Sequence, residues 1–287
     1  MQTIDLQTQI KFERILLATD FSTVAEIAQA YALGLALQDG ATLELTTVVT
    51  LPTLDAMSEC ALDSIRLRGE EDLRRIAKPI RGVTVTSKVV EGFQVPAAIV
   101  EEAVASSADL LVLGTTSKMG LKKLALGSTA EEIIRSAHCP VLTIGPNVGD
   151  PPRGPISFQR IVYATDFSSQ AEKGVNLTLA LAQTPGAKVY LCHVVADHGA
   201  SRCEHCEARF LASLKALIPE SVHCTSEPEF VVEHGNASEA ILALAKRVNA
   251  DLIVLGARKA SFWVEFVQTG LTPALLAGAT CPVLTVC

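Results

Sequence analysis

Aromatic side chains are scarce in this sequence, which has one Trp, three Tyr and nine Phe among 287 residues. Proteins that bind single-stranded nucleic acid by stacking need several such rings on one surface. The net charge is −7 and there is no long run of Lys or Arg, which also argues against a surface that binds phosphodiester backbones. We therefore expect no nucleic-acid partner.

Long apolar runs are missing as well. No stretch of about 18 apolar residues is present, so a membrane span and a membrane partner are not expected. The sequence from Met1 to Leu6 lacks the basic start and the apolar core of a secretory signal, which favours a cytoplasmic location. In that compartment the eight Cys residues are expected to be thiols or metal ligands rather than disulfides.

Three segments of the first half recur in the same order in the second half, and we infer an internal duplication. The pairs are Lys11–Ser22 and Ser157–Ser168, Ala108–Gly114 and Ala250–Gly256, and Cys139–Ile144 and Cys281–Val286. The segment between the copies, Gly145–Pro155, is dense in Pro and Gly and is typical of a linker. We expect one domain over residues 1–146, a linker over 147–157 and a second domain over 158–287.

Within the first copy, strand patterns alternate with helix patterns. Strands are expected at 14–18, 42–49, 83–90, 110–113 and 141–144, and helices at 22–38, within 55–76, at 96–106 and at 128–137. Thr23 with Glu26, and Ser169 with Glu172, match the capping box that begins a helix. Apolar strands that alternate with helices predict an α/β fold in which each copy is a doubly wound, five-stranded parallel sheet.

Ligands of such sheets bind beyond the carboxyl ends of the strands, where the strand order reverses. Asp20 follows the first strand, and Gly114 ends the fourth. Gly127-Ser128-Thr129 then begins a helix, so its hydroxyls and backbone N–H groups suit a phosphate. The alternatives are a turn-forming role for Asp20, and a glycine turn with Ser128 as a helix cap. Neither a Walker pattern nor Gly-x-Gly-x-x-Gly is present.

These residues resemble those of the universal stress protein family, over nearly the whole chain and as two tandem domains. The family's pattern Gly-x2-Gly-x9-Gly-[Ser/Thr] reads here from Gly114 to Ser128, with Ser117 in place of the second Gly, and Thr19-Asp20-Phe21-Ser22 matches its first strand end. The resemblance implies a Rossmann-like, adenine nucleotide α-hydrolase-like fold and ATP in the first domain, with Mg²⁺ bridging the phosphates. The implied ATP contacts are Ala18, Thr19, Asp20, Val48, Leu113, Gly114, Thr116, Ser117, Gly127, Ser128, Thr129 and Ala130.

The resemblance also implies how the two copies differ and how they meet. The phosphate pattern is degenerate in the second copy, where Lys259, Thr269 and Gly270 replace Ser117, Gly127 and Ser128, so we expect no ATP there even though Asp166 is retained. The last strands, 141–144 and 283–286, are expected to pair within the chain as a pseudo-dimer. Association into a homodimer is left open.

Cys and His residues are concentrated in the second copy. Cys203 and Cys206 form a CxxC pair that could bind Zn²⁺ together with His193, His198 or His223. Inert thiols and a redox pair are the alternatives.

No catalytic constellation is evident, so at most slow ATP hydrolysis is expected. The favoured hypothesis is an ATP-binding regulator of the stress response, in which the nucleotide orders residues 115–126 and a regulatory protein partner reads that surface. The alternatives are a nucleotide-free scaffold and a metal- or thiol-dependent sensor.

Overall fold

The computed structural model describes residues 11–51, 59–115, 128–168, 171–196, 204–219, 226–256 and 271–286. In the first half the elements are β1 (Arg14–Ala18), α1 (Thr23–Asp39), β2 (Thr42–Thr50), α2 (Glu59–Ala77), β3 (Val85–Gly92), α3 (Val95–Ala105), β4 (Leu110–Gly114), α4 (Ser128–Ser136) and β5 (Val141–Ile144). In the second half they are β6 (Arg160–Thr165), α5 (Ala171–Leu181), β7 (Lys188–Val195), α6 (Glu204–Ala216), β8 (Glu229–His234), α7 (Ala237–Val248), β9 (Leu252–Gly256), α9 (Leu271–Gly278) and β10 (Val283–Val286).

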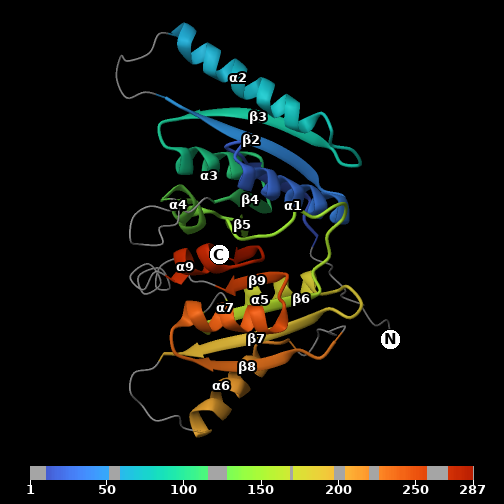
Figure 1. The fold of residues 1–287 in the computed structure, drawn as a ribbon, viewed down its shortest axis with the longest axis vertical. Coiled ribbons are helices and arrows are strands. Elements are labelled where there is room, and N and C mark those ends of the chain that lie inside the picture. Colours follow the sequence, from blue (N-terminus) through green and yellow to red (C-terminus); the bar gives the residue numbers. More distant parts are fainter. Residues whose placement is uncertain are drawn as a thin grey trace, which may run out of the picture.

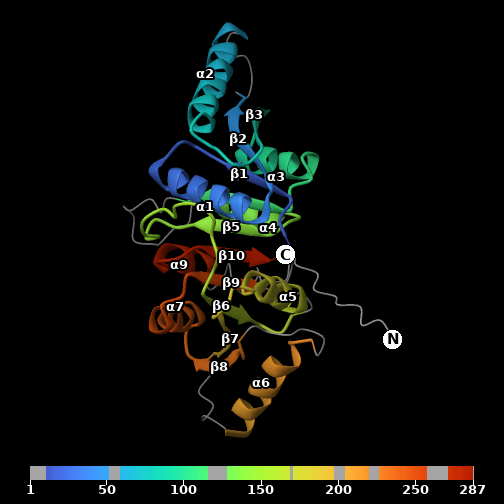
Figure 2. The ribbon, with the colours of Figure 1, turned by 90° about the vertical axis from the view of Figure 1, so that its right-hand side faces the viewer.

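All these strands form one ten-stranded sheet in the order β3-β2-β1-β4-β5-β10-β9-β6-β7-β8. The strands of each half are parallel to one another, and β5 and β10 pair antiparallel at the centre. Figures 1 and 2 show the halves end to end along the long axis, with this pair between them. The predicted fold class and the predicted pairing of the last strands within the chain are confirmed.

The central strands of the sheet are buried on both faces because their residues are almost all apolar, whereas the edge strands β3 and β8 carry polar and partly exposed residues. Along β1, Ile15 and Leu17 belong to one buried cluster and Leu16 and Ala18 to the other, as alternation along a strand requires. Helices α1, α2, α5 and α6 contribute to the first cluster, and α3, α4, α7 and α9 contribute to the second. The molecule is therefore a three-layer α/β/α structure that continues from one half into the other.

The segment between β5 and β6 holds the halves together by further contacts. The backbone N–H of Ile156 donates to the carbonyl of Gly34 in α1 at 3.1 Å. A side chain at Gly34 would overlap Ile156 and would lie 2.8 Å from the carbonyl oxygen of Gly154, so a glycine is needed there. The side-chain amide of Asn147 donates to the carbonyl of Ala277 at the end of α9. The connecting segment thus packs on a helix from each half.

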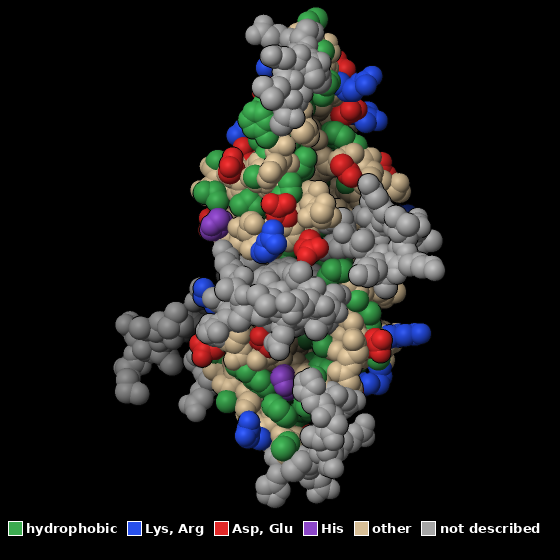
Figure 3. Space-filling model, turned by 90° about the vertical axis from the view of Figure 1, so that its left-hand side faces the viewer, with side chains coloured by type: hydrophobic (Ala, Val, Ile, Leu, Met, Phe, Trp, Pro, Cys, Tyr) green, Lys and Arg blue, Asp and Glu red, His purple; other side chains and the backbone are tan. Residues whose placement is uncertain are grey.

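Two features of the described residues concern contact with membranes and charged partners. Within the described ranges, none of the helices has the length and hydrophobicity needed to cross a bilayer. On the face in Figure 3, acidic and basic side chains of the described residues are interspersed rather than gathered by sign.

The predicted boundaries agree with the structure to within two residues, and two of the differences have local reasons. The third strand begins at Val85 rather than 83, because Gly82 lies in the preceding turn with φ 84°. Ser22 rather than Thr23 caps α1, and its side chain accepts a hydrogen bond from the N–H of Ala25 at 3.3 Å. The prediction of a capping box with Thr23 as the N-cap and Glu26 as its partner is therefore wrong, because the cap lies one residue earlier.

Candidate functional site

The carboxyl ends of β1 and β4 lie side by side, with Ala18 beside Leu113. In the sheet, β2 and β3 lie on one side of β1, and β4 and β5 lie on the other. The gap between the ends of β1 and β4 is therefore the predicted switch point of a doubly wound sheet. Ala18 and Leu113 are buried in the core, so only their backbones could meet a ligand. Asp20, directly beyond β1, is exposed.

The loop after β1 is held by its own side chains. The Thr19 hydroxyl accepts from the N–H of Phe21 at 3.0 Å, and a carboxylate oxygen of Asp20 accepts from the N–H of Ser22 at 3.0 Å. Phe21 between them has φ 61°, a conformation that a bulky residue adopts only when its surroundings impose it. The turn-forming role considered for Asp20 is thus present. The hydrogen bond from Ser22 uses one of the two carboxylate oxygens of Asp20.

The second copy builds the same loop after β6. The hydroxyl of Thr165 accepts from the N–H of Phe167 at 3.0 Å, Asp166 accepts from the N–H of Ser168 at 2.8 Å, and Phe167 has φ 59°. Retention of Thr-Asp-Phe-Ser in both copies therefore has a structural cause that does not depend on a ligand.

Gly114 at the end of β4 is required by packing. A Cβ atom there would lie 2.8 Å from the backbone nitrogen of Ala25 and 2.9 Å from the carbonyl carbon of Val24, both in the first turn of α1. The absence of a side chain lets α1 approach the strand end, which also brings the Thr19–Ser22 loop close to β4. Its counterpart Gly256 is needed for another reason, since a Cβ there would overlap the hydroxyl of Tyr163.

The phosphate side of the predicted site is described in part. Ser128 and Thr129 are exposed in the first turn of α4, whereas Ala130 is buried in the core. Exposed hydroxyls beside the N–H groups of a helix N-terminus are suited to an anion. Glu131 lies in the same turn and adds negative charge. Thr116, Ser117 and Gly127 lie outside the described residues.

The end of β2 carries Val48, which is half-buried and packs against the cluster that contains α3. Two residues earlier on the same face, Thr46 lies beside Ala18 and its carbonyl accepts from the N–H of Thr19 at 2.9 Å. The fully buried Thr46 hydroxyl donates to Glu44 at 3.4 Å. Sequence reasoning did not identify Thr46, which is buried on the same strand as Val48 and holds the start of the Asp20 loop.

A group of charged residues from three elements, β2, β3 and α3, adjoins Thr46 through its hydrogen bond to Glu44. The ammonium of Lys88 on β3 donates to both carboxylate oxygens of Glu102 on α3, at 2.7 and 2.6 Å. Glu102 is buried, and its proximity is a secondary cause, after burial itself, of the raised pKa of Glu44. Lys88 partly offsets this by favouring the charged form. The group fixes α3 against β2 and β3.

The second copy contains a small cavity at the corresponding strand ends. It has a volume of about 80 Å³ and is lined by Ala164, Thr165, Asp166, Cys192, His193, Val194, Ala237, Ile241 and Leu255. Cys192 takes the place of Thr46, since it lies beside Ala164 as Thr46 lies beside Ala18. Burial raises the pKa of the Cys192 thiol to about 12, which keeps it protonated at neutral pH.

The candidate zinc ligands are only partly described. The ring of His193 meets those of Phe167 and Phe210 at a tilt, with ring centres 4.5 and 4.7 Å away, and its Nδ1 is 2.9 Å from the carbonyl oxygen of Thr165. Burial lowers the pKa of His193. Cys206 is exposed on α6. Cys203, His198 and His223 lie outside the described residues, and among those that are described no group of three or more His, Cys, Asp or Glu could hold a metal ion.

Comparison with known proteins agrees with this architecture. Residues 11–145 and 157–286 each match the universal stress protein family. Universal stress protein MJ0531 of Methanocaldococcus jannaschii is 35% identical over 142 residues, which are 46% of this chain and 82% of that protein. A universal stress protein of Thermus aquaticus is 32% identical over 136 residues, covering 46% of this chain and 98% of that protein.

A solved structure extends the likeness to both halves at once. The crystal structure of a universal stress protein from Archaeoglobus fulgidus superposes with a TM-score of 0.72 and 21% identity, covering 95% of each chain. This likeness concerns the fold, which is Rossmann-like and of the adenine nucleotide α-hydrolase type. With the family matched twice along its length, this chain belongs to the universal stress protein family.

Proposed function

We propose that this protein is an ATP-binding regulator of the stress response that holds one nucleotide, in its first half. The observation that carries the proposal is the arrangement at one edge of the first half. There an exposed carboxylate, Asp20, and Val48, on the part of β2 that extends beyond β1, belong to the same domain as a helix N-terminus with two exposed hydroxyls, Ser128 and Thr129. A nucleotide needs acceptors for its sugar and base and donors for its phosphates, and these residues supply both.

In this proposal the adenosine lies over Thr46, between the Asp20 loop and the backbone of Val48. The carboxylate oxygen of Asp20 that does not hold the turn would accept from a ribose hydroxyl. The triphosphate would meet the first-turn N–H groups of α4 and the hydroxyls of Ser128 and Thr129. Mg²⁺ would supply positive charge between the phosphates and Glu131, whose carboxylate otherwise opposes an anion at this helix end.

The second half is proposed not to bind ATP. Its strand-end cavity of about 80 Å³ is well below the roughly 300 Å³ at which small-molecule pockets begin. The hydroxyl and ring of Tyr163 fill the space beside Gly174 and Gly256, where the corresponding strand position in the first half is Leu17. The hydroxyl of Ser128 is also lost, since Gly270 stands at that position of the repeat.

Substitution at the start of α4 tests the proposal without disturbing the fold. Ser128→Asp places a carboxylate where the helix dipole stabilises it, so the protein should fold as well as wild type. The same carboxylate repels a triphosphate, and affinity for Mg-ATP should fall about tenfold or more in isothermal titration calorimetry.

Ser136→Asp is the matched control, because it adds the same charge at the other end of α4, about 12 Å away. It should leave Mg-ATP affinity within about twofold of wild type. Equal affinities for the Ser128→Asp variant and wild type would contradict phosphate binding at this helix. A wild-type protein that shows no binding of Mg-ATP would favour the nucleotide-free scaffold.

A further inference from the structure

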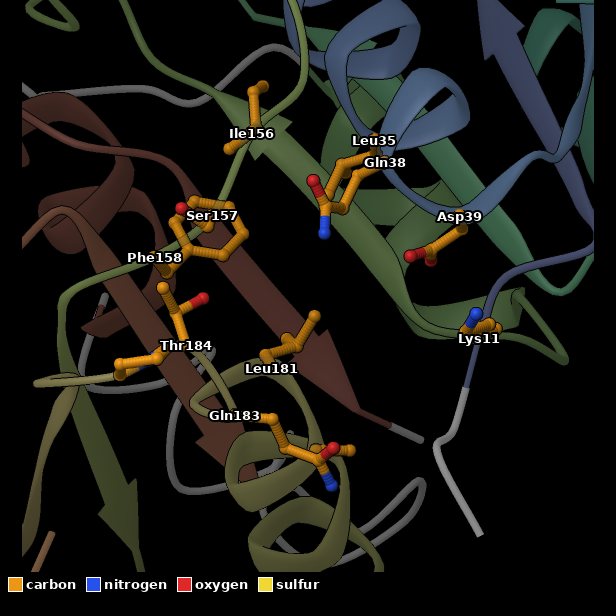
Figure 4. Close-up of a pocket in the computed structure, with 12 residues that line it drawn as sticks. Lys11, Leu35, Gln38, Asp39, Ile156, Ser157, Phe158, Leu181, Gln183 and Thr184 are labelled. Carbon is orange, nitrogen blue, oxygen red and sulfur yellow. The ribbon is translucent and has the colours of Figure 1, made fainter. Parts of the chain in front are cut away.

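A second cavity lies between the two halves, away from the nucleotide site. It has a volume of about 490 Å³, within the range of ordinary small-molecule pockets. Figure 4 shows that residues of α1, of the segment before β6 and of the end of α5 surround it. Its polar lining includes Lys11, Gln38, Asp39 and Gln183.

Part of the wall is apolar and well anchored. Leu35, Ile156 and Phe158 are buried members of the main core cluster, and Leu181 packs against that cluster. The segment that carries Ile156 is fixed to α1 by the hydrogen bond to Gly34. This wall provides a preformed surface for a short aliphatic chain.

The polar part of the lining favours positive charge. The last turns of α1 and α5 both line the cavity, and neither helix has a basic residue in its last turn. The carbonyl ends of helices carry partial negative charge, so both helices favour a cation there. Asp39 adds a carboxylate, and the amide oxygens of Gln38 and Gln183 add two acceptors.

Asp39 is half-buried, and one of its carboxylate oxygens accepts from the backbone N–H of Phe12 at 2.9 Å. Burial raises the pKa of Asp39, and the carboxylate of Asp109 contributes in the same direction, whereas the Phe12 hydrogen bond and Lys11 lower it. Among the described residues, Asp39 has no ion pair within 4.0 Å. Lys11 therefore influences Asp39 from a distance and does not neutralise it by contact.

We propose that this cavity binds a small aliphatic amine in its ammonium form, of the alkyl diamine class. One ammonium group meets the carboxylate of Asp39 and the amide oxygen of Gln38 at the end of α1, and the other meets the amide oxygen of Gln183 and the carbonyl end of α5. The alkyl chain lies along Leu35, Leu181 and Ile156. Because the ligand contacts both halves, its binding stabilises their association.

The probe is 1,5-diaminopentane, titrated calorimetrically into the full-length protein at low salt, with 1,5-pentanediol as the uncharged control of the same length. The diamine should bind and the diol should not. Asp39→Asn keeps an oxygen that accepts from Phe12 but removes the charge, and should weaken diamine binding about tenfold. Asp72→Asn removes a half-buried carboxylate that pairs with Arg75 on α2 and does not line the cavity, and it should change diamine affinity less than twofold.

A substitution of Lys11 should change diamine affinity in the opposite direction to Asp39→Asn, which provides an independent test. Lys11 is exposed at the edge of the cavity and opposes a bound cation. Lys11→Met should therefore tighten diamine binding, by roughly twofold. Failure of the diamine to bind, equal binding of the diol, or weaker diamine binding in the Lys11→Met variant would each overturn the proposal.

Discussion

Leu142 of β5 lies opposite Leu284 of β10 in the antiparallel pair that joins the two halves, and both side chains are almost completely buried. Pairing of these strands gives each half a neighbour at the edge where its own sheet would otherwise end. The pair thus serves within one chain as the junction of a pseudo-dimer.

Truncation at this junction should be costly. Leu142→Ala and Leu284→Ala are each expected to lower the free energy of unfolding by about 2–5 kcal/mol, because each removes a buried side chain and leaves a cavity. The double variant should lose less than the sum, since the residues are neighbours in one register. Urea unfolding followed by circular dichroism measures all three; strictly additive losses would argue against direct contact.

Two hydroxyls at the same junction should be dispensable. Thr143 and Thr285 are buried, and within the described structure their hydroxyl oxygens have no hydrogen-bond partner. Thr143→Val and Thr285→Val keep the shape of the side chain and remove an unsatisfied polar group. Each should raise the free energy of unfolding by about 1 kcal/mol. A loss of stability in either variant would show that its hydroxyl is satisfied.

Gly114 should tolerate no side chain. In Gly114→Ala the new methyl group meets the backbone of Ala25 and Val24, so α1 has to move and the protein should lose about 1–3 kcal/mol of stability. Gly149→Ala is the matched control, because a Cβ atom there meets nothing within 4 Å. Thermal unfolding of the two variants should separate them clearly. Equal melting temperatures would contradict the close approach of α1 to β4.

The pH dependence of stability should report on Glu44. Its pKa is raised, chiefly by burial and then by Glu102, so the folded protein holds this proton more tightly than the unfolded chain does. The associated stability is present below the ordinary Glu pKa of 4.5 and is lost as the pH rises through the raised value.

Glu44→Gln has no carboxyl group to ionise, so the variant does not lose this stability as the pH rises. The amide oxygen can still accept from Thr46. Relative to wild type, the variant should therefore become more stable as the pH increases from about 4 to 8. Melting temperatures measured across that range provide the comparison. A difference that stays constant with pH would mean that Glu44 titrates normally.

The strands and the doubly wound fold class were accessible from the sequence because the signals are local and repeated. The apolar run at Arg14–Ala18 and its copy at Arg160–Thr165 predict buried parallel strands, and Thr19-Asp20-Phe21-Ser22 marks the turn after each. The choice between Ser22 and Thr23 as the helix cap was not accessible, because both residues suit that position and one backbone conformation decides between them.

Features built from distant segments could not be predicted. Glu44, Lys88 and Glu102 come from two strands and a helix, and nothing in their spacing indicates that they meet. The cavity beside Asp39 depends on where α5 ends relative to α1, more than a hundred residues away in the sequence. His193 was considered as a zinc ligand, but nothing in its sequence surroundings indicates that its ring contacts Phe167 and Phe210.

The central claim is one nucleotide per chain, held by the first half. It is tested most directly by purifying the full-length protein gently, saturating it with Mg-ATP, removing the excess, and measuring released nucleotide by mass spectrometry against protein concentration. Wild type should release about one equivalent, and the Ser128→Asp variant close to none. Two equivalents from wild type would contradict the assignment of the second half, and none would contradict nucleotide binding altogether.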